Sequence, residues 1–92
     1  MIKSSADKDT VALFNGMRVR RLANLEKPAR RKLEYLNAAK TLDDLRVPSG
    51  NRLEALKGSR AGQHSIRINA QFRVCFRWHN GDAHDVEICD YH

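Results

Sequence analysis

The chain has 92 residues, a length that predicts one domain spanning residues 1–92. Hydrophobic residues make up 41% and charged residues 30%, and no apolar run reaches the roughly 18 residues that a membrane span needs. Seventeen basic against eleven acidic residues give a formal net charge of +6, which favours a polyanionic partner, either nucleic acid or an acidic protein. The first residues contain no apolar signal core, so we expect a cytoplasmic protein.

The cysteines and histidines do not have the spacing of a metal site. Cys75 and Cys89 are too far apart in sequence for a zinc-binding pair, and the four histidines form no HxxxH motif. Two cysteines are also too few for a disulfide scaffold. We therefore expect neither a metal nor a cofactor.

Residues 1–47 have helical patterns. Met1–Ser4 is a candidate edge strand, and Asp7 is a candidate N-cap of a short helix that stops at Asn15-Gly16. A clearer helix begins near Pro28, with apolar residues at helical spacing. Thr41 is positioned to cap one further turn before the chain breaks at residues 47–50.

Residues 51–92 alternate between apolar and polar side chains, which is typical of strands with one buried face. This pattern predicts an antiparallel sheet covered on one side by the helices, an α+β fold. The predicted core positions of the sheet are Leu53, Ala55, His64, Ile66, Ile68, Phe72, Val74, Phe76, Trp78, Val86 and Ile88.

The last hairpin carries the turn signal Asn80-Gly81. A two-residue loop would set Val86 opposite Cys75 and so place apolar side chains among charged ones. A three-residue loop places the apolar side chains of both strands on the same side of the sheet. We therefore expect a loop over His79–Gly81. The expected pairs are Val86 with Val74, Ile88 with Phe72, and Glu87 with Arg73.

In this register Cys75 and Cys89 are about 13 Å apart, beyond the roughly 7 Å limit for a disulfide, so we expect free thiols. The polar face of the sheet is basic, which suits a nucleic-acid surface. A solvated face with ion pairs such as Arg73–Glu87 is the alternative, and the pattern alone does not choose between them. The members of this face are Ser65, Arg67, Asn69, Arg73, Arg77, Glu87 and Tyr91.

Three stretches together resemble a known family. Residues 52–58 contain L-x-x-L-K-G, residues 62–78 contain S-I-R-x-N followed by R-x-x-F, and residues 86–92 end in D-Y-H. In this order and spacing they resemble the HigB-type toxins, the killer-protein branch of the RelE superfamily, over essentially the whole chain.

The resemblance implies a RelE-like α+β fold, with helices on one face of a small, mostly antiparallel twisted sheet. It implies a type II toxin that cuts mRNA in the ribosomal A site and so inhibits translation and growth. The expected partners are a HigA-type helix-turn-helix antitoxin and the ribosome with its mRNA. Operator DNA would be contacted only through the antitoxin, and no membrane is involved.

RNA cleavage without a metal uses the adjacent 2′-OH as nucleophile and needs a base, positive charge at the phosphate, an acid and alignment. We assign Lys57 and Arg73 to supply the positive charge at the phosphate. The alternatives are an ion pair with Glu87 for Arg73 and a solvated loop position for Lys57.

The final residues Asp90, Tyr91 and His92 are candidates for proton transfer and base stacking, because an unperturbed histidine titrates near neutral pH. The alternative is a frayed polar end. Glu54 is a candidate base at a position where some family members carry histidine, although it could equally pair with Arg52 or Lys57.

Further cations are candidates for holding RNA. Arg60, Arg67 and Arg77 lie in the strand half. A second cluster, which is either a docking surface for ribosomal RNA or a solvated helix face, comprises Arg18, Arg20, Arg21, Lys27, Arg30, Arg31 and Lys32.

Two positions depart from the family pattern. Ala70 stands where many relatives have Asp, and Ser5 replaces a usual Phe. Ala70 and the absence of a histidine at Glu54 leave an alternative, in which the chain is a weakly active or inactive homologue that binds the antitoxin and operator DNA. A third reading is an interaction protein without affinity for nucleic acid, which would need its basic face covered by its own acidic groups.

Overall fold

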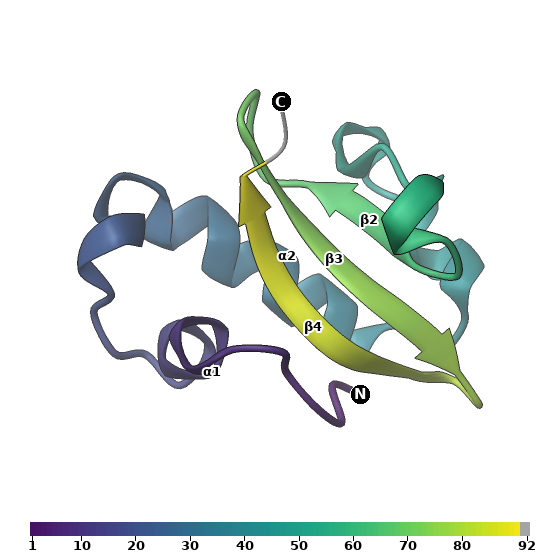
Figure 1. Cartoon of the computed structure of the whole chain (residues 1–92), viewed down its shortest axis with the longest axis horizontal. Coiled ribbons are helices and arrows are strands. Elements are labelled where there is room, and N and C mark those ends of the chain that lie inside the picture. Colours follow the sequence, from purple (N-terminus) through teal and green to yellow (C-terminus); the bar gives the residue numbers. More distant parts are fainter. Residues whose placement is uncertain (91–92) are drawn as a thin grey trace.

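The structure, a computed structural model, describes residues 1–90 (Figure 1). Helices α1 (Lys8–Phe14) and α2 (Glu26–Ala38) precede an antiparallel sheet of order β1-β2-β3-β4. Its strands are β1 (Glu54–Ala55), β2 (His64–Arg67), β3 (Phe72–His79) and β4 (Asp82–Asp90). Short 3₁₀ helices connect them: η1 (Arg20–Leu25), η2 (Leu42–Arg46), η3 (Ser49–Asn51) and η4 (Gly58–Arg60). The predicted α+β fold is confirmed.

The helices begin where the sequence predicts caps. The Asp7 carboxylate accepts a hydrogen bond from the Thr10 amide at 3.0 Å, which satisfies a backbone donor that the first turn of α1 cannot pair. Thr41 and Asp44 form a reciprocal capping box at the start of η2. Hydrogen bonds from the Thr41 and Lys40 amides lower the pKa of Asp44.

The core lies between α2 and the sheet, and Figure 1 shows α2 behind β3 and β4. Leu33 and Leu36 of α2 are fully buried against the same cluster as Val74 and Phe76 of β3. None of the helices within residues 1–90 is long and apolar enough to cross a membrane.

The free edge of β4 is covered by the start of the chain. Ile2 and Ser5 make parallel bridges to Ala83 and Val86, and the amide of Lys3 donates to the Ala83 carbonyl at 2.8 Å. The predicted edge strand is therefore present as two isolated bridges. Covering this edge removes unpaired backbone groups that would otherwise invite pairing with another chain.

The predicted three-residue hairpin loop is wrong. His79 pairs with Asp82, so the loop is Asn80-Gly81, and both residues have positive φ, 51° and 80°. This geometry matches the twist of the strands, and the Asn-Gly sequence suits it. The expected pairs are also wrong, since Ile88 lies opposite Val74 and Glu87 opposite Cys75.

A β-bulge explains why the apolar side chains of β3 and β4 share one side of the sheet even though the loop has two residues. The register shifts between Cys75 and Arg77, whose partners Glu87 and His84 leave one additional residue on β4. Asp85, inside this interval, has φ of 53°. One additional residue reverses the facing of every side chain beyond it, so Val86 and Ile88 return to the core.

The corrected register also brings the cysteines together. Cys75 and Cys89 are two positions apart on the same face of neighbouring strands and share a buried cluster with Leu56. The expected separation of about 13 Å is therefore wrong, whereas the prediction of free thiols is confirmed. A hydrogen bond from Cys89 to Cys75 lowers the pKa of Cys75 and, together with burial, raises the pKa of Cys89.

The face of the sheet opposite the helices is only partly solvated. Ser65 and Cys75 are fully buried there, because the segment from Leu56 to Gln63 folds over the centre of the sheet. In Figure 1 the η4 turn lies in front of β2. The alternating pattern predicted the direction of these side chains but not this cover.

Candidate active site and nucleic-acid interface

Arg73 is the most firmly held cation of the sheet face. Its Nε donates to Ser65 Oγ at 2.7 Å, and its Nη2 donates to the Arg52 carbonyl, also at 2.7 Å. The Glu54 carboxylate lies 3.9 Å from Nη2. The Arg73 side chain is 11% exposed, and its bonds fix the guanidinium at the edge of the loop cover, the segment from Leu56 to Gln63 that folds over the sheet.

The expected pair of Arg73 with Glu87 is wrong, because the register sets Cys89 opposite Arg73. Glu87 instead accepts from Arg60 Nη2 at 3.2 Å, and Arg60 Nη1 donates to Gln63 at 3.0 Å. Arg60 is thus tied to β4 across the face, and its charge is paired with Glu87 inside the protein.

Glu54 and Lys57 belong to the segment that borders the face. Glu54 is 47% exposed and lies in register with Ser65, and its nearby cation is Arg73 rather than Arg52 or Lys57. Lys57 is exposed and immediately precedes η4. The structure therefore brings Glu54 and Arg73 together at one end of a short segment that ends in Lys57.

Asp90 is the last described residue of β4 and pairs in register with Phe72. Its carboxylate accepts from Gln71 Nε2 at 3.1 Å. Phe72 points to the core, so the register gives Asp90 the helix-side face at the end of the strand, whereas Arg73 lies on the other face. Tyr91 and His92 lie outside the described residues.

The turn that contains Ala70 is closed by Asn69. Its side-chain oxygen accepts from the amides of Gln71 and Phe72 at 2.9 and 2.8 Å. The Arg67 guanidinium donates to the Asn69 carbonyl at 3.1 Å. The turn next to Arg73 is therefore stabilised without a carboxylate at position 70.

The helix-side cations fall into two groups. Arg21 pairs with Asp9 at 2.6 Å, and Arg30 donates to the Leu13 carbonyl at 2.9 Å, so both stabilise the packing of α1. Arg20 and Arg31 are exposed. Lys32 donates to the buried Asn51 side chain at 2.6 Å, and burial together with Arg31 and Arg67 lowers its pKa. None of these belongs to the sheet face.

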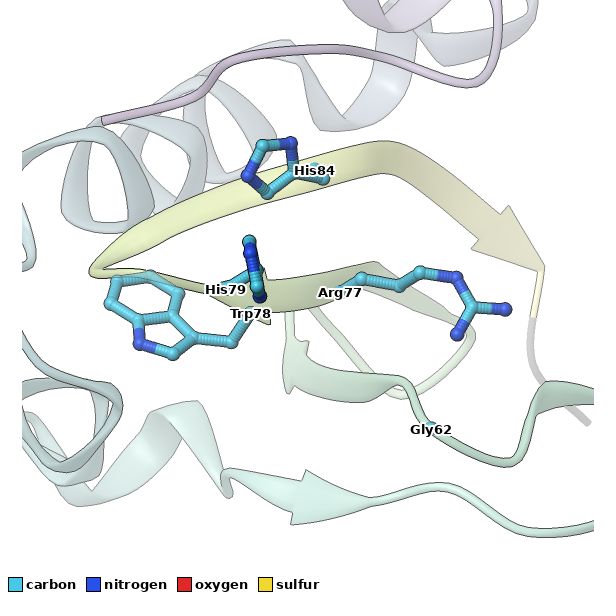
Figure 2. A pocket seen from close by; sticks show the side chains of 5 residues that line it. All are labelled: Gly62, Arg77, Trp78, His79 and His84. Atoms are coloured by element: carbon cyan, nitrogen blue, oxygen red, sulfur yellow. The ribbon is translucent and has the colours of Figure 1, made fainter.

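Arg77 lies on the same face as Arg73, four residues along β3, and pairs with Asp85 at 3.6 Å. Beside it, Gly62, Trp78, His79 and His84 line an open hollow of about 360 Å³ (Figure 2). The sequence alone did not indicate a site at either histidine or the anchoring role of Ser65. The two-residue Asn80-Gly81 turn sets His84 opposite Arg77, so the three-residue loop expected from the sequence concealed this pair.

The fold is that of a small α+β protein with an anchored arginine on the sheet face opposite the helices. The family model of the RelE-like toxin of type II toxin–antitoxin system HigB matches residues 7–92. The chain belongs to this family, as the sequence resemblance implied.

Curated relatives agree with this placement. The chain is 48% identical over 61 residues to Toxin HigB-1 of Vibrio cholerae, covering 66% of this chain and 64% of that protein. It is 44% identical over 41 residues to Endoribonuclease HigB of Proteus vulgaris, covering 45% of each. The aligned part thus spans less than two thirds of the length of these relatives.

Solved structures share the fold. The YoeB–YefM complex from Staphylococcus aureus matches with a TM-score of 0.57 at 17% identity, covering 100% of this chain and 98% of that one. The YoeB dimer from the same organism matches with a TM-score of 0.56, covering 99% and 97%. At this identity the likeness establishes the arrangement of helices and sheet.

Proposed function

We propose that the chain is a ribosome-dependent endoribonuclease that cuts mRNA in the A site and so arrests translation in the cytoplasm. The observation that carries this proposal is Arg73, a guanidinium held by Ser65 and Arg52 on the face opposite the helices. A fixed cation of this kind suits a phosphate that gains charge during the reaction. The relative named Endoribonuclease HigB supports the activity.

The proposed reaction is attack of the 2′-oxygen on the adjacent phosphorus, with cleavage of the bond to the 5′-oxygen. The fragments then end in a 2′,3′-cyclic phosphate and a 5′-hydroxyl. A base takes the proton of the 2′-OH, and an acid protonates the leaving 5′-oxygen. No metal or other cofactor enters this scheme.

We assign Arg73 and Lys57 to stabilise the negative charge on the phosphate. Glu54 is a candidate base because its carboxylate is half exposed and lies beside Arg73. Tyr91 and His92 are the candidates for the remaining proton transfer and for base stacking, and Asp90 is a weaker candidate because its register places it on the face opposite Arg73. Arg60, Arg67 and Arg77 would hold flanking RNA, and Arg20 and Arg31 would dock ribosomal RNA, with weaker roles for the internally bonded Arg21 and Arg30.

The proposed protein partner is a HigA-type helix-turn-helix antitoxin that brings the complex to operator DNA. The net charge of +6 supports an acidic antitoxin surface as well as RNA. Titrating this chain with the antitoxin and measuring the loss of mRNA cleavage tests the inhibitory contact.

The decisive experiment uses ribosomes programmed with a defined mRNA, with cleavage mapped by primer extension. We expect cuts in the A-site codon, a 2′,3′-cyclic phosphate on the upstream fragment, and no comparable cutting of free mRNA. Arg73→Ala should slow cleavage by about 10²–10³. Lys57→Ala and His92→Gln test the other assigned groups, and Arg46→Ala, on an exposed arginine of η2, is the control.

An alternative is a homologue that binds antitoxin and operator without cutting RNA. Ala70 and the carboxylate at Glu54 favour this alternative, since both depart from the family pattern. Binding to ribosomes that weakens with salt, without any cleavage, would assign the chain to this class. Equal cleavage by the parent chain and Arg73→Ala would overturn the assigned site.

A further inference from the structure

The hollow at the hairpin end of the sheet face lies outside the proposed catalytic residues. It is lined by Gly62, Arg77, Trp78, His79 and His84, and Figure 2 shows the two imidazoles next to one another on β3 and β4. Their ring centroids are 6.1 Å apart at an interplanar angle of 62°. Arg73 and Arg77 are on the same face of β3, about 13 Å apart along the strand.

The hollow is open because position 62 has no side chain. Gly62 has φ of +92°, and a Cβ placed there would lie 2.9 Å from Arg77 Nη1. The guanidinium therefore packs directly over the backbone at Gly62. Any larger residue would have to displace Arg77 and would also be strained in this conformation.

Strand β4 supplies the other wall through His84. The two-residue Asn80-Gly81 turn sets His84 opposite Arg77, and the bulge residue Asp85, at φ of 53°, brings its carboxylate 3.6 Å from Arg77 Nε. The Arg77 and Asp85 side chains are both about half exposed, so a ligand can reach the guanidinium. The regular pairing of the hairpin thus brings a cation and two imidazoles together.

These groups are suited to one nucleotide. Single-stranded RNA is commonly held by a cation at the phosphate and by flat side chains against the base. A hollow of about 360 Å³ lies within the range of small-ligand sites. An acidic peptide could use the cation, but it has no use for two adjacent imidazole rings.

We propose that this hollow binds a single-stranded RNA nucleotide that flanks the cleaved phosphate, with its phosphate on Arg77 and its base against His79 and His84. The position of this nucleotide along the mRNA rests on the proposed function, because it depends on the scissile phosphate lying at Arg73. The affinity of the hollow for a nucleotide does not depend on it.

The test is an NMR titration of the whole chain with a nucleoside 5′-monophosphate, followed through the imidazole resonances of His79 and His84. We expect saturable shifts, and at least a five-fold weaker Kd for Arg77→Ala and for His84→Ala. Arg46→Ala, another arginine paired with an aspartate, should leave the Kd unchanged. Gly62→Ala should weaken binding by displacing Arg77, with thermal melting as a check that it folds.

The outcomes separate the two proposals. Arg73→Ala should slow mRNA cleavage by about 10²–10³ and leave nucleotide binding in the hollow intact. Binding that persists in a chain that cuts no mRNA would overturn the proposed function but not the nucleotide site. The site itself is overturned if no saturable shift occurs at millimolar nucleotide, if Arg77→Ala binds as the parent does, or if only an acidic peptide produces the shifts.

Discussion

Ser65→Ala tests whether the hydrogen bond to Arg73 is what holds the cation of the proposed site. Ser65 is fully buried, and its hydroxyl oxygen accepts from Arg73 Nε at 2.7 Å. A hydrogen bond to a charged group contributes about 1.5–3 kcal/mol, and its loss leaves a charged donor unsatisfied at a mostly buried position. We expect the free energy of unfolding to fall by this amount.

Arg73→Lys completes a double-mutant cycle. Lysine keeps the positive charge but cannot reproduce the two bonds that the guanidinium makes to Ser65 and to the Arg52 carbonyl. If the bond to Ser65 is real, the double variant should be less destabilised than the sum of the two single variants, with a coupling of about 1 kcal/mol or more. Ser59→Ala, at an exposed serine of η4, controls for removal of a hydroxyl.

The assay is urea unfolding at pH 7, combined with single-turnover cleavage on programmed ribosomes. Ser65→Ala should also slow cleavage by about ten-fold, because a guanidinium without its anchor is less well oriented. Two results would refute the reasoning. One is a coupling below about 0.5 kcal/mol, the range expected of independent sites; the other is a Ser65→Ala variant that cleaves as fast as the parent.

Three further predictions concern the fold. Leu33→Ala, at a fully buried position of α2, should cost about 2–5 kcal/mol in urea unfolding, while Glu34→Ala on the exposed side should change stability by less than about 0.5 kcal/mol. Folding lowers the pKa of Asp44, so the ionised carboxylate stabilises the folded state. This stabilisation is complete above the ordinary pKa of 3.8 and is lost as the pH falls through the lower folded value. The difference in free energy of unfolding between the parent and Asp44→Ala, measured at a series of pH values, should therefore become smaller in acid. A difference that does not change with pH would contradict this. Cys75 and Cys89 are buried thiols, so a water-soluble disulfide reagent should modify them slowly in the native protein and rapidly in denaturant, and fast native labelling would count against the loop cover.

Local chemistry explains why the helical half was predictable. Asp7 and Thr41 cap their helices through bonds to amides three residues away, so the signal and its partner lie in the same short segment. The apolar spacing of Leu33 and Leu36 likewise needs no knowledge of the sheet to indicate a buried helix face.

The hairpin shows where local reasoning stops. The Asn80-Gly81 signal correctly indicated a two-residue loop. The expectation that the apolar side chains of β3 and β4 lie on one side of the sheet was also correct. The two agree only through a bulge at Asp85, which has a positive φ without being glycine. That conformation is held by long-range contacts, including a hydrogen bond from its amide to Ser4 Oγ at 2.9 Å.

The sequence by itself determined the α+β class, the caps, the core face of β2, β3 and β4 and the resemblance to HigB-type toxins, because each depends on short patterns or on residue order. The predicted core position Ala55 is wrong, since both residues of β1 are exposed. Only the tertiary structure decided the partners across the sheet: Arg73 with Ser65, Arg60 with Glu87, Cys75 beside Cys89, and the hollow between His84 and Gly62. These contacts depend on register, and a single inserted residue in β4 changes which side chains meet.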